Sequence, residues 1–319
     1  MDPKEPFLSV IVPCYNEEEV LAETYRRLTS VVTRHGWSYE LLFINDGSKD
    51  RTLSILREIA AADARVRVLS FSRNFGHQPA VSAGIRHCSG EVAIIIDADL
   101  QDPPELFPDM IDLYRKEQAN VVYAKRRERK GESAFKLWTA RSFYRVINSL
   151  SEVPLPLDTG DFRLIDKHVI REFKNLQERN KYIRGLISWM GFKQVPIEYV
   201  REERFAGSTK YPLSKMLKFA RTGLLYFSKK PLQVALTLGF LSILVGLGLA
   251  VWVVTGIFFR PETLVPGWAS IVIAVVFFGG VQLLTIGVLG EYLGSIFDEI
   301  KKRPEFIVAE QINFDENPS

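Results

Sequence analysis

The 319-residue sequence has few cysteines and histidines, and its charges nearly balance. Its two cysteines, Cys14 and Cys88, are too few for a disulfide framework and form no CxxC pair, which favours a reducing compartment. The four histidines lack the spacing of zinc ligands. A net charge of +3 argues against a protein that coats nucleic acid. The sequence has neither GxGxxG nor GxxxxGK[ST], so neither a Rossmann dinucleotide site nor a P-loop is indicated.

Two long apolar runs lie near the C-terminus. Residues 232–259 and 266–290 contain no Asp, Glu, Lys or Arg, and each exceeds the roughly 20 residues that a membrane-spanning helix needs. A buried core helix is the alternative for each run. The short link between them predicts a hairpin of two transmembrane helices, about 232–259 and 267–290, within residues 231–295. Its glycines, Gly246, Gly248, Gly290 and Gly294, favour a homo-oligomer because they let helices approach closely.

Basic residues flank both outer ends of the predicted hairpin. The positive-inside rule therefore predicts an integral membrane protein with residues 1–230 and the tail 296–319 in the cytoplasm. The first apolar run is too short for a signal peptide and reads as a strand. Residues 211–230 have one apolar and one basic face, which predicts an amphipathic juxtamembrane helix in the membrane surface. The alternative is a helix that packs on the soluble domain.

The first 200 residues alternate between strand and helix patterns. One helix is expected to start after Asn16 and another at Asp102. Repeated βαβ units predict an α/β fold, a doubly wound, mostly parallel sheet with helices on both faces, over residues 1–210. The expected strands are Leu8–Val12, Glu40–Ile44, Val66–Phe71, Val92–Ile96 and Val121–Tyr123.

Polar and acidic residues follow these strands, at the edge where such sheets bind ligands. Asp97 and Asp99 come directly after a buried strand, where two carboxylates cannot both stay ionised without a nearby cation. Oxygen ligands suit Mg²⁺ or Mn²⁺, so we predict that Asp97, Asp99 and Gln101 bind one of these ions. The alternative is that the two carboxylates only cap a helix or close a turn.

Five motifs occur in order along the chain. They are Val-Pro-Cys-Tyr-Asn-Glu-Glu (12–18), Asn-Asp-Gly-Ser (45–48), Phe-Ser-Arg-Asn-Phe-Gly (71–76), Asp-Ala-Asp-Leu-Gln-Asp-Pro-Pro-Glu (97–105) and Asp-Thr-Gly-Asp-Phe-Arg (158–163). This ordered set resembles the GT-A glycosyltransferases of family 2, in particular those that transfer a sugar to a polyprenyl phosphate. Dolichol-phosphate mannose synthases and bactoprenol glucosyltransferases are the most similar types, and the resemblance covers about residues 7–230. His77 is a departure, because many relatives carry Lys there.

The resemblance implies roles for individual residues. Besides Asp97, the residues expected to hold the nucleotide are Pro13, Tyr15, Glu17, Asp46, Arg204 and Lys210. Those expected to face the acceptor phosphate are Arg126, Arg201 and Ser208. As alternatives, Glu17 pairs with a helix dipole, Asp46 closes a turn, and the basic residues attract anionic lipid.

The catalytic residues implied by the resemblance are Asp161, Asp158 and Asp99. Asp161 is the favoured carboxylate beside the acceptor, with Asp158 second. A phosphate monoester has its second pKa near 6 and is already nucleophilic at neutral pH. We therefore favour a positioning role for Asp161, with general-base catalysis as the alternative.

Together these features predict an inverting glycosyltransferase of the bacterial inner membrane. It would move a hexose, glucose first, from a nucleotide sugar, UDP-glucose first, to undecaprenyl or another polyprenyl phosphate. GDP-mannose and UDP-N-acetylglucosamine are the next donors in order. The alternatives are a processive polysaccharide synthase, whose Gln-x-x-Arg-Trp motif is missing here, a sugar-lipid flippase or transporter, and an inactive scaffold.

Overall fold

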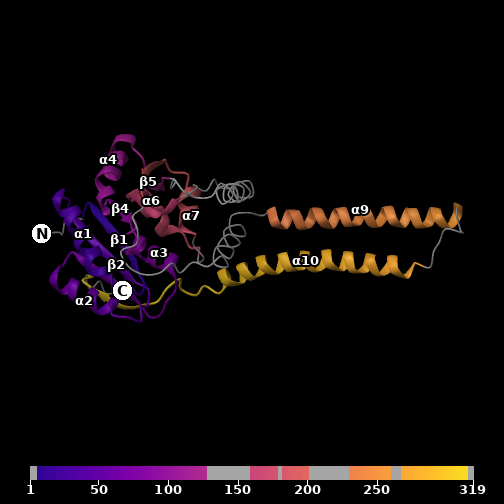
Figure 1. Ribbon diagram of the computed structural model, residues 1–319, viewed down its shortest axis with the longest axis horizontal. Helices are drawn as coiled ribbons and strands as arrows, with labels where there is room; N and C mark the ends of the chain where they lie inside the picture. The colour runs from indigo at the N-terminus through magenta and orange to yellow at the C-terminus, as the bar shows by residue number, and fades with distance from the viewer. Residues whose placement is uncertain (1–5, 128–158, 179–181, 201–229, 260–266, 315–319) are drawn as a thin grey trace. The chain divides into compact units, whose positions relative to one another are not determined.

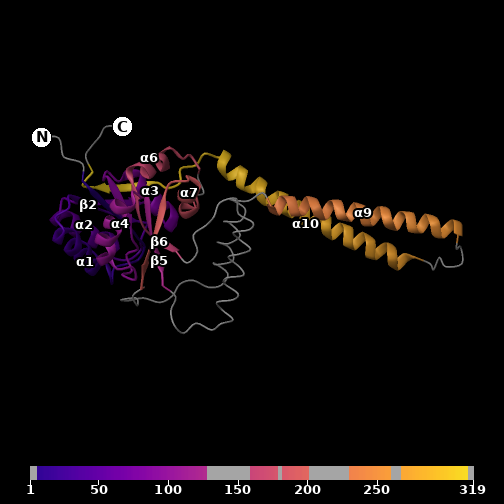
Figure 2. The ribbon, with the colours of Figure 1, turned by 90° about the horizontal axis from the view of Figure 1, so that it is seen from above.

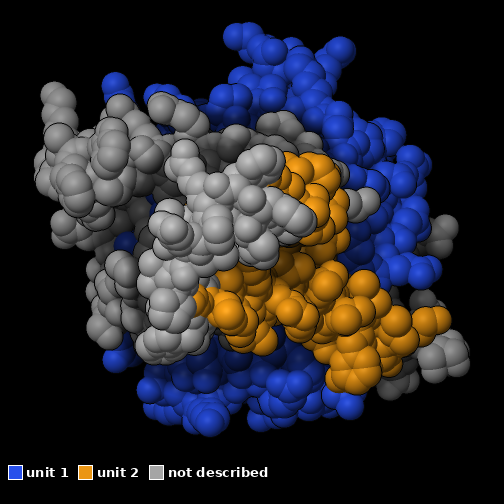
Figure 3. All heavy atoms as spheres, turned by 90° about the vertical axis from the view of Figure 1, so that its right-hand side faces the viewer, with its two compact units in different colours: residues 1–144, 153–211, 303–319 blue, residues 145–152, 212–302 orange. Residues whose placement is uncertain are grey.

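The computed structural model describes residues 6–127, 159–178, 182–200, 230–259 and 267–314 (Figure 1). The chain divides into two compact units, which Figure 3 colours separately. Unit 1 consists of residues 1–144, 153–211 and 303–319, and unit 2 of residues 145–152 and 212–302. The predicted amphipathic helix lies, but for its last residue, outside the described residues.

Unit 1 is an α/β unit, as the sequence predicts. Its strands are β1 (Leu8–Cys14), β2 (Tyr39–Asn45), β3 (Val66–Phe71), β4 (Val92–Ile95), β5 (Val121–Arg126), β6 (Thr159–Asp166), β7 (Gln194–Tyr199) and β8 (Val308–Ile312). Its helices are α1 (Leu21–Arg34), α2 (Thr52–Ala62), α3 (His77–His87), the 3₁₀ helix η1 (Pro104–Leu106), α4 (Phe107–Glu117), α6 (Lys167–Asn175) and α7 (Ile183–Trp189).

The strands form one mixed sheet in the order β7-β5-β6-β4-β1-β2-β3-β8. The central strands β4, β1, β2 and β3 are parallel, and β5 and β7 are parallel to each other. β6 runs antiparallel between β4 and β5, and β8 runs antiparallel on the edge of β3. The five predicted strands are confirmed, and β6, β7 and β8 are additional.

Helices cover both faces of this sheet (Figures 1 and 2). All seven residues of β1 are buried, as expected for a strand with both faces covered. Val10 lies in the core that the sheet shares with α1, α2 and α4, whereas Ile11 on the opposite face meets α3. A Cβ atom on Gly84 of α3 would lie 2.2 Å from Ile11 Cγ2. Glycine at this position therefore allows α3 to pack directly on the sheet.

Two helices begin later than their sequence patterns suggest. The predicted start after Asn16 is wrong, because α1 begins at Leu21. Residues 16–18 are held instead by the segment after β2, where the side chains of Ser48, Thr52 and Asp50 accept hydrogen bonds from their backbone N–H groups. The predicted start at Asp102 is also wrong, since η1 begins at Pro104 and the carboxylate of Asp102 accepts a hydrogen bond from Tyr199. Both segments are loops at the carboxyl edge of the sheet.

The segment assigned as a tail, 296–319, contributes to the fold. α10 (Trp268–Ile300) extends into it, and β8 then pairs with β3 (Figure 2). Phe306 stacks on Phe71 with the ring centroids 4.9 Å apart. Ser82 of α3 donates to Glu305 at 2.9 Å. Residues 303–314 therefore cover an edge of the sheet and contact α3.

Unit 2 contains α9 (Lys230–Phe259) and α10, which pack against each other. Within the described residues, one segment, Phe277–Ile300, is long and apolar enough to cross a membrane, and Leu232–Gly248 is a shorter apolar stretch. The two predicted helices are thus present, while a membrane-spanning hairpin stays a prediction. Gly246 lies beside α10: a Cβ atom there would lie 3.7 Å from Phe278 Cζ, an ordinary contact distance, so the packing of the two helices does not require glycine at this position. The homo-oligomer also stays a prediction.

Candidate active site

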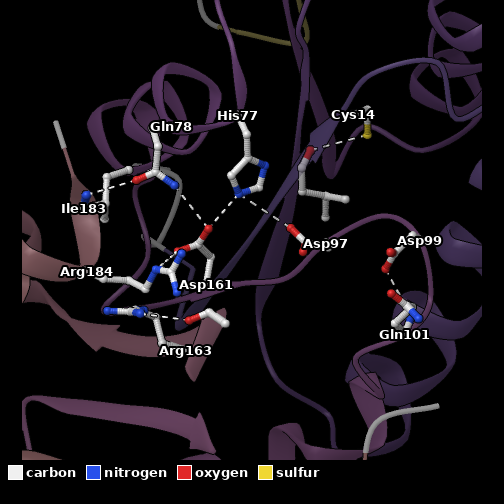
Figure 4. A network of polar contacts seen from close by, with 12 residues as sticks. Cys14, His77, Gln78, Asp97, Asp99, Gln101, Asp161, Arg163, Ile183 and Arg184 are labelled. Carbon is white, nitrogen blue, oxygen red and sulfur yellow. Dashed lines mark hydrogen bonds and ion pairs between the residues drawn. The ribbon is translucent and has the colours of Figure 1, made fainter. Parts of the chain in front are cut away.

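The sheet topology brings two predicted carboxylates together. β6 is antiparallel to β4, with Ile95 opposite Arg163. Two positions further along, beyond the carboxyl end of β4, are Asp97 on one segment and Asp161 on the other. The start of α3 contributes His77 and Gln78 to the same place (Figure 4).

Asp161 is held by side chains from two helices (Figure 4). His77 Nε2 lies 2.8 Å from Asp161 Oδ2, and Gln78 Nε2 donates to the same oxygen at 3.2 Å. Arg184 of α7 forms an ion pair, with its Nε 3.1 Å from Asp161 Oδ1, although the geometry is not that of a hydrogen bond. A second cation, the buried Arg163, lies on the same strand and donates to Gly160 O at 3.0 Å.

These neighbours determine the charge of Asp161. Burial alone would raise its pKa, but the hydrogen bond with His77 and the charge of Arg184 outweigh burial and hold the pKa well below the usual range. A carboxylate with such a low pKa is a weak proton acceptor. This environment agrees with the predicted positioning role of Asp161, and the choice between that role and general-base catalysis stays a prediction.

Asp97 has the opposite electrostatic environment. Burial and neighbouring carboxylates raise its pKa to about 6, although the charge of His77 opposes this shift. His77 Nε2 lies 3.8 Å from Asp97 Oδ1. A bound cation would stabilise the ionised form of Asp97.

His77 is a site residue that the sequence analysis did not identify, since there it is only a departure from the relatives. Burial would lower its pKa, but the hydrogen bond with Asp161 and the charge of Asp97 raise the pKa to about 9. The imidazole is therefore protonated at neutral pH. Its place at the start of the helix after β3 is the one sequence signal that could have identified it.

The predicted metal ligands lie where a cation could bind. Asp97 and Asp99 are both partly exposed, and Asp99 Oδ1 accepts from the backbone N–H of Gln101 at 3.2 Å. Within the described segments, no cluster of three or more His, Cys, Asp or Glu side chains could hold a metal. Mg²⁺ commonly uses one or two carboxylates and completes its shell with water and substrate phosphates. Asp97 and Asp99 fit that mode, and ligation by the Gln101 side chain stays a prediction.

The residues expected to hold the nucleotide line the ends of β1 and β2. Pro13 is buried, Tyr15 is exposed and Glu17 is partly exposed. The carboxylate of Asp46 is buried and accepts hydrogen bonds from the backbone N–H groups of Phe75 at 2.7 Å and of Gly76 at 2.9 Å. Asp46 thus fixes the loop that leads into α3. Direct contact of these four residues with a nucleotide stays a prediction.

Gly47 lets that loop approach β2. Its φ is +62°, and a Cβ atom there would lie 2.3 Å from the carbonyl carbon of Arg73. No other residue type could occupy this position without moving the backbone. The Asn-Asp-Gly motif therefore has a structural function next to the site.

Arg126 lies on β5, beside the strand that carries Asp161. Its Nε donates to Tyr199 Oη at 3.3 Å, and Tyr199 in turn donates to the buried Asp102. A Cβ atom on Gly160 would lie 3.1 Å from Arg126 Nη2, so glycine leaves room for the guanidinium. Neither Asp102 nor Tyr199 was predicted. The other predicted residues, Asp158, Arg201, Arg204, Ser208 and Lys210, lie outside the described residues.

Acidic and polar side chains gathered beyond the carboxyl ends of the strands are typical of α/β proteins that bind a ligand there. The model of the family "Glycosyl transferase family 2" matches residues 9–174. The chain therefore belongs to glycosyl transferase family 2, and the predicted class of transferase with a GT-A-like α/β fold is confirmed.

Relatives match nearly the whole chain. An uncharacterized glycosyltransferase of Bacillus subtilis, YkcC, is 50% identical over 94% of this chain and 92% of its own. A prophage-derived bactoprenol glucosyl transferase of Shigella flexneri is 40% identical over 94% of this chain and 97% of its own. A solved structure of glucosyl-3-phosphoglycerate synthase from Mycobacterium tuberculosis is similar with a TM-score of 0.47 and 21% identity, over 69% of this chain and 76% of its own.

Proposed function

We propose that this chain is a membrane-bound inverting glycosyltransferase that moves a hexose from a nucleotide sugar to a polyprenyl phosphate. The first choice of donor is UDP-glucose, which supplies glucose, and the first choice of acceptor is undecaprenyl phosphate. The observation that carries this proposal is the 40% identity to a bactoprenol glucosyl transferase over 94% of the chain, including the C-terminal helices. Sequence similarity restricted to the sheet would support only a shared family.

The reaction would be a single displacement. A phosphate oxygen of the acceptor attacks the anomeric carbon, and the bond from that carbon to the nucleotide diphosphate oxygen breaks. The products are a sugar-phosphate lipid of inverted configuration and a nucleoside diphosphate. Because the acceptor phosphate loses its second proton near pH 6, it needs no proton acceptor at neutral pH. The low pKa of Asp161 agrees with a carboxylate that orients its neighbours instead of taking a proton.

Asp97 and Asp99 would hold Mg²⁺ or Mn²⁺ beside the donor. When bound, such an ion neutralises charge that develops on the departing diphosphate. Gln101 and the nucleotide-binding residues, Pro13, Tyr15, Glu17 and Asp46, would complete the donor side. Arg126, on the strand beside Asp161, would face the acceptor phosphate, since a guanidinium binds phosphate oxygens in pairs.

The C-terminal helices would anchor the enzyme where its acceptor is found. We propose that α9 and α10 cross the bacterial inner membrane as a hairpin, with unit 1 and both termini in the cytoplasm. The apolar segments of both helices support this arrangement. Residues 211–230 would lie in the membrane surface, and the chain would act as a homo-oligomer.

A donor panel tests the proposal. The full chain in lipid nanodiscs would receive UDP-glucose, GDP-mannose or UDP-N-acetylglucosamine, each with undecaprenyl or dolichyl phosphate, and mass spectrometry would identify the lipid product. We expect one hexose per lipid phosphate. Polymer without a lipid-linked monosaccharide would identify a processive synthase, and no product from any pair would contradict transfer to polyprenyl phosphate.

A further inference from the structure

The imidazole of His77 lies between two carboxylates that come from different segments (Figure 4). Its Nε2 is 2.8 Å from Asp161 Oδ2 and 3.8 Å from Asp97 Oδ1. The proposed function uses Asp97 for the donor side and Asp161 for the acceptor side. His77 contacts both of these carboxylates.

The backbone that carries His77 is firmly fixed. Asp46 binds the N–H groups of Phe75 and Gly76 just before it. Further along the same helix, Gly84 lies against Ile11 in the core. The imidazole therefore projects from a rigid support, and Asp161 is the group whose orientation it can determine.

Gln78 contributes a second link from the same helix. Its Nε2 donates to Asp161 Oδ2 at 3.2 Å, while its Oε1 accepts from the backbone N–H of Ile183 at 3.0 Å. This amide thus joins α3 to the start of α7. His77 and Gln78 bind the same oxygen of Asp161. Loss of the imidazole would therefore leave Asp161 with a single contact from α3, the longer hydrogen bond from Gln78.

We infer that His77 is a positioning residue that acts through Asp161, holding this carboxylate beside Asp97 so that acceptor and donor meet in a fixed orientation. The inference rests on the proposed function, since it assumes that Asp161 faces the acceptor. Misplacement of a reacting group by about 1 Å costs on the order of 10²-fold in rate. Loss of the His77 contact should therefore slow transfer without preventing nucleotide binding.

A double-mutant cycle in the full chain tests this inference. The variants are His77→Ala, Asp161→Asn, the double variant, and His77→Gln, whose amide can still donate to Asp161. His87→Gln is the matched control, because His87 ends the same helix and contacts Ala83 O instead of the site. The readouts are kcat and KM for polyprenyl phosphate, the calorimetric affinity for UDP with Mn²⁺, and the melting temperature.

We expect His77→Ala to lose about 10²-fold in kcat/KM for the acceptor and to bind UDP as the unsubstituted chain does. His77→Gln should recover most of the loss, and His87→Gln should keep the full rate. In the Asp161→Asn background, His77→Ala should lower kcat/KM for the acceptor less than threefold, because the effects of two residues that act through one contact are not additive. Equal losses in both backgrounds would overturn the inference, as would a fully active His77→Ala variant.

The proposed function is tested separately by the unsubstituted chain. If it transfers no sugar to polyprenyl phosphate, the proposed function fails before any variant is compared. If it does transfer and the cycle is additive, the inference fails alone. If His77→Ala melts much lower than the unsubstituted chain, the rate of His77→Gln is compared with that of Asp161→Asn. A His77→Gln variant as slow as Asp161→Asn would then overturn the inference, and a much faster one would support it.

Discussion

Replacement of Asp161 by Asn separates its two possible roles. The substitution keeps one oxygen acceptor and removes the charge that pairs with His77 and Arg184. A hydrogen bond to a charged partner contributes about 1.5–3 kcal/mol, and at least one such contact is lost. We therefore expect the free energy of unfolding to fall by about 2–3 kcal/mol at pH 7, and transfer to slow about 10²-fold because the site loses its alignment.

The pH dependence of stability follows from the depressed pKa of Asp161. Its contribution is present in full above the unfolded-state value of about 4 and is lost as the pH falls through the lower folded value. The difference in melting temperature between the unsubstituted chain and Asp161→Asn should thus be largest near pH 5–6 and shrink in acid, where Asp161 takes up a proton. It should also shrink above about pH 6.5, because the stabilising protonation of His77, whose pKa Asp161 raises to about 9, is lost as the pH rises toward that value. A difference that grew in acid would contradict this assignment.

The pH–rate profile of Asp161→Asn at saturating acceptor and metal tests the role itself. If Asp161 positions other groups, the acidic limb of the profile should remain near pH 6, where the acceptor phosphate ionises. If it is the base, kcat should fall by about 10²–10⁴ and the acidic limb should disappear. Loss of that limb would refute the positioning role and restore general-base catalysis.

Three further predictions concern the metal site, the acceptor side and the C-terminal segment. Asp99→Asn should abolish transfer and remove the Mn²⁺ dependence of UDP binding, because an amide carries no charge; calorimetry with unchanged Mn²⁺ dependence would count against Asp99. Tyr199→Phe removes the hydroxyl between Asp102 and Arg126, and should raise KM for the acceptor about tenfold while the affinity for UDP stays constant. An unchanged KM would show that Arg126 needs no such support. Phe306→Ala should lower the free energy of unfolding by about 1–3 kcal/mol through loss of the stack on Phe71, whereas the exposed neighbour Ile307→Ala should cost under about 0.5 kcal/mol in the same denaturant titration.

The sequence predicts the parts of the fold that depend on local hydrophobicity. The strands β1 to β5 are buried apolar runs, so their pattern is sufficient. β6 escapes the pattern because it carries two charged residues, Asp161 and the fully buried Arg163. Asp161 meets its partners His77 and Arg184 only in the folded chain. β8 is short and mixed, and it forms because the chain returns to the edge of β3 after α10.

The residues of the candidate site also divide into those visible in the local sequence and those that depend on distant contacts. Asp97 and Asp99 could be predicted because they follow a strand that the sequence identifies, and the sheet edge is where ligands bind. Tyr199 and Arg184 could not be predicted, since each becomes a site residue through a contact distant in sequence. For His77 the sequence offers only its place at the start of the helix after β3, and its partner Asp161 is not visible from there. His77 meets Asp161, for example, only because β6 runs antiparallel beside β4.

The two carboxylates beside His77 have different electrostatic environments, which fit the two substrates of the proposed reaction. Asp97 has a raised pKa and carboxylate neighbours, so its ionised form gains from an added cation. Asp161 has a depressed pKa and is already paired with His77 and Arg184. Environments that move two pKa values apart assign different roles to chemically identical groups. A divalent cation with its diphosphate thus suits the Asp97 side, and a phosphate anion suits the side where protein cations already surround Asp161.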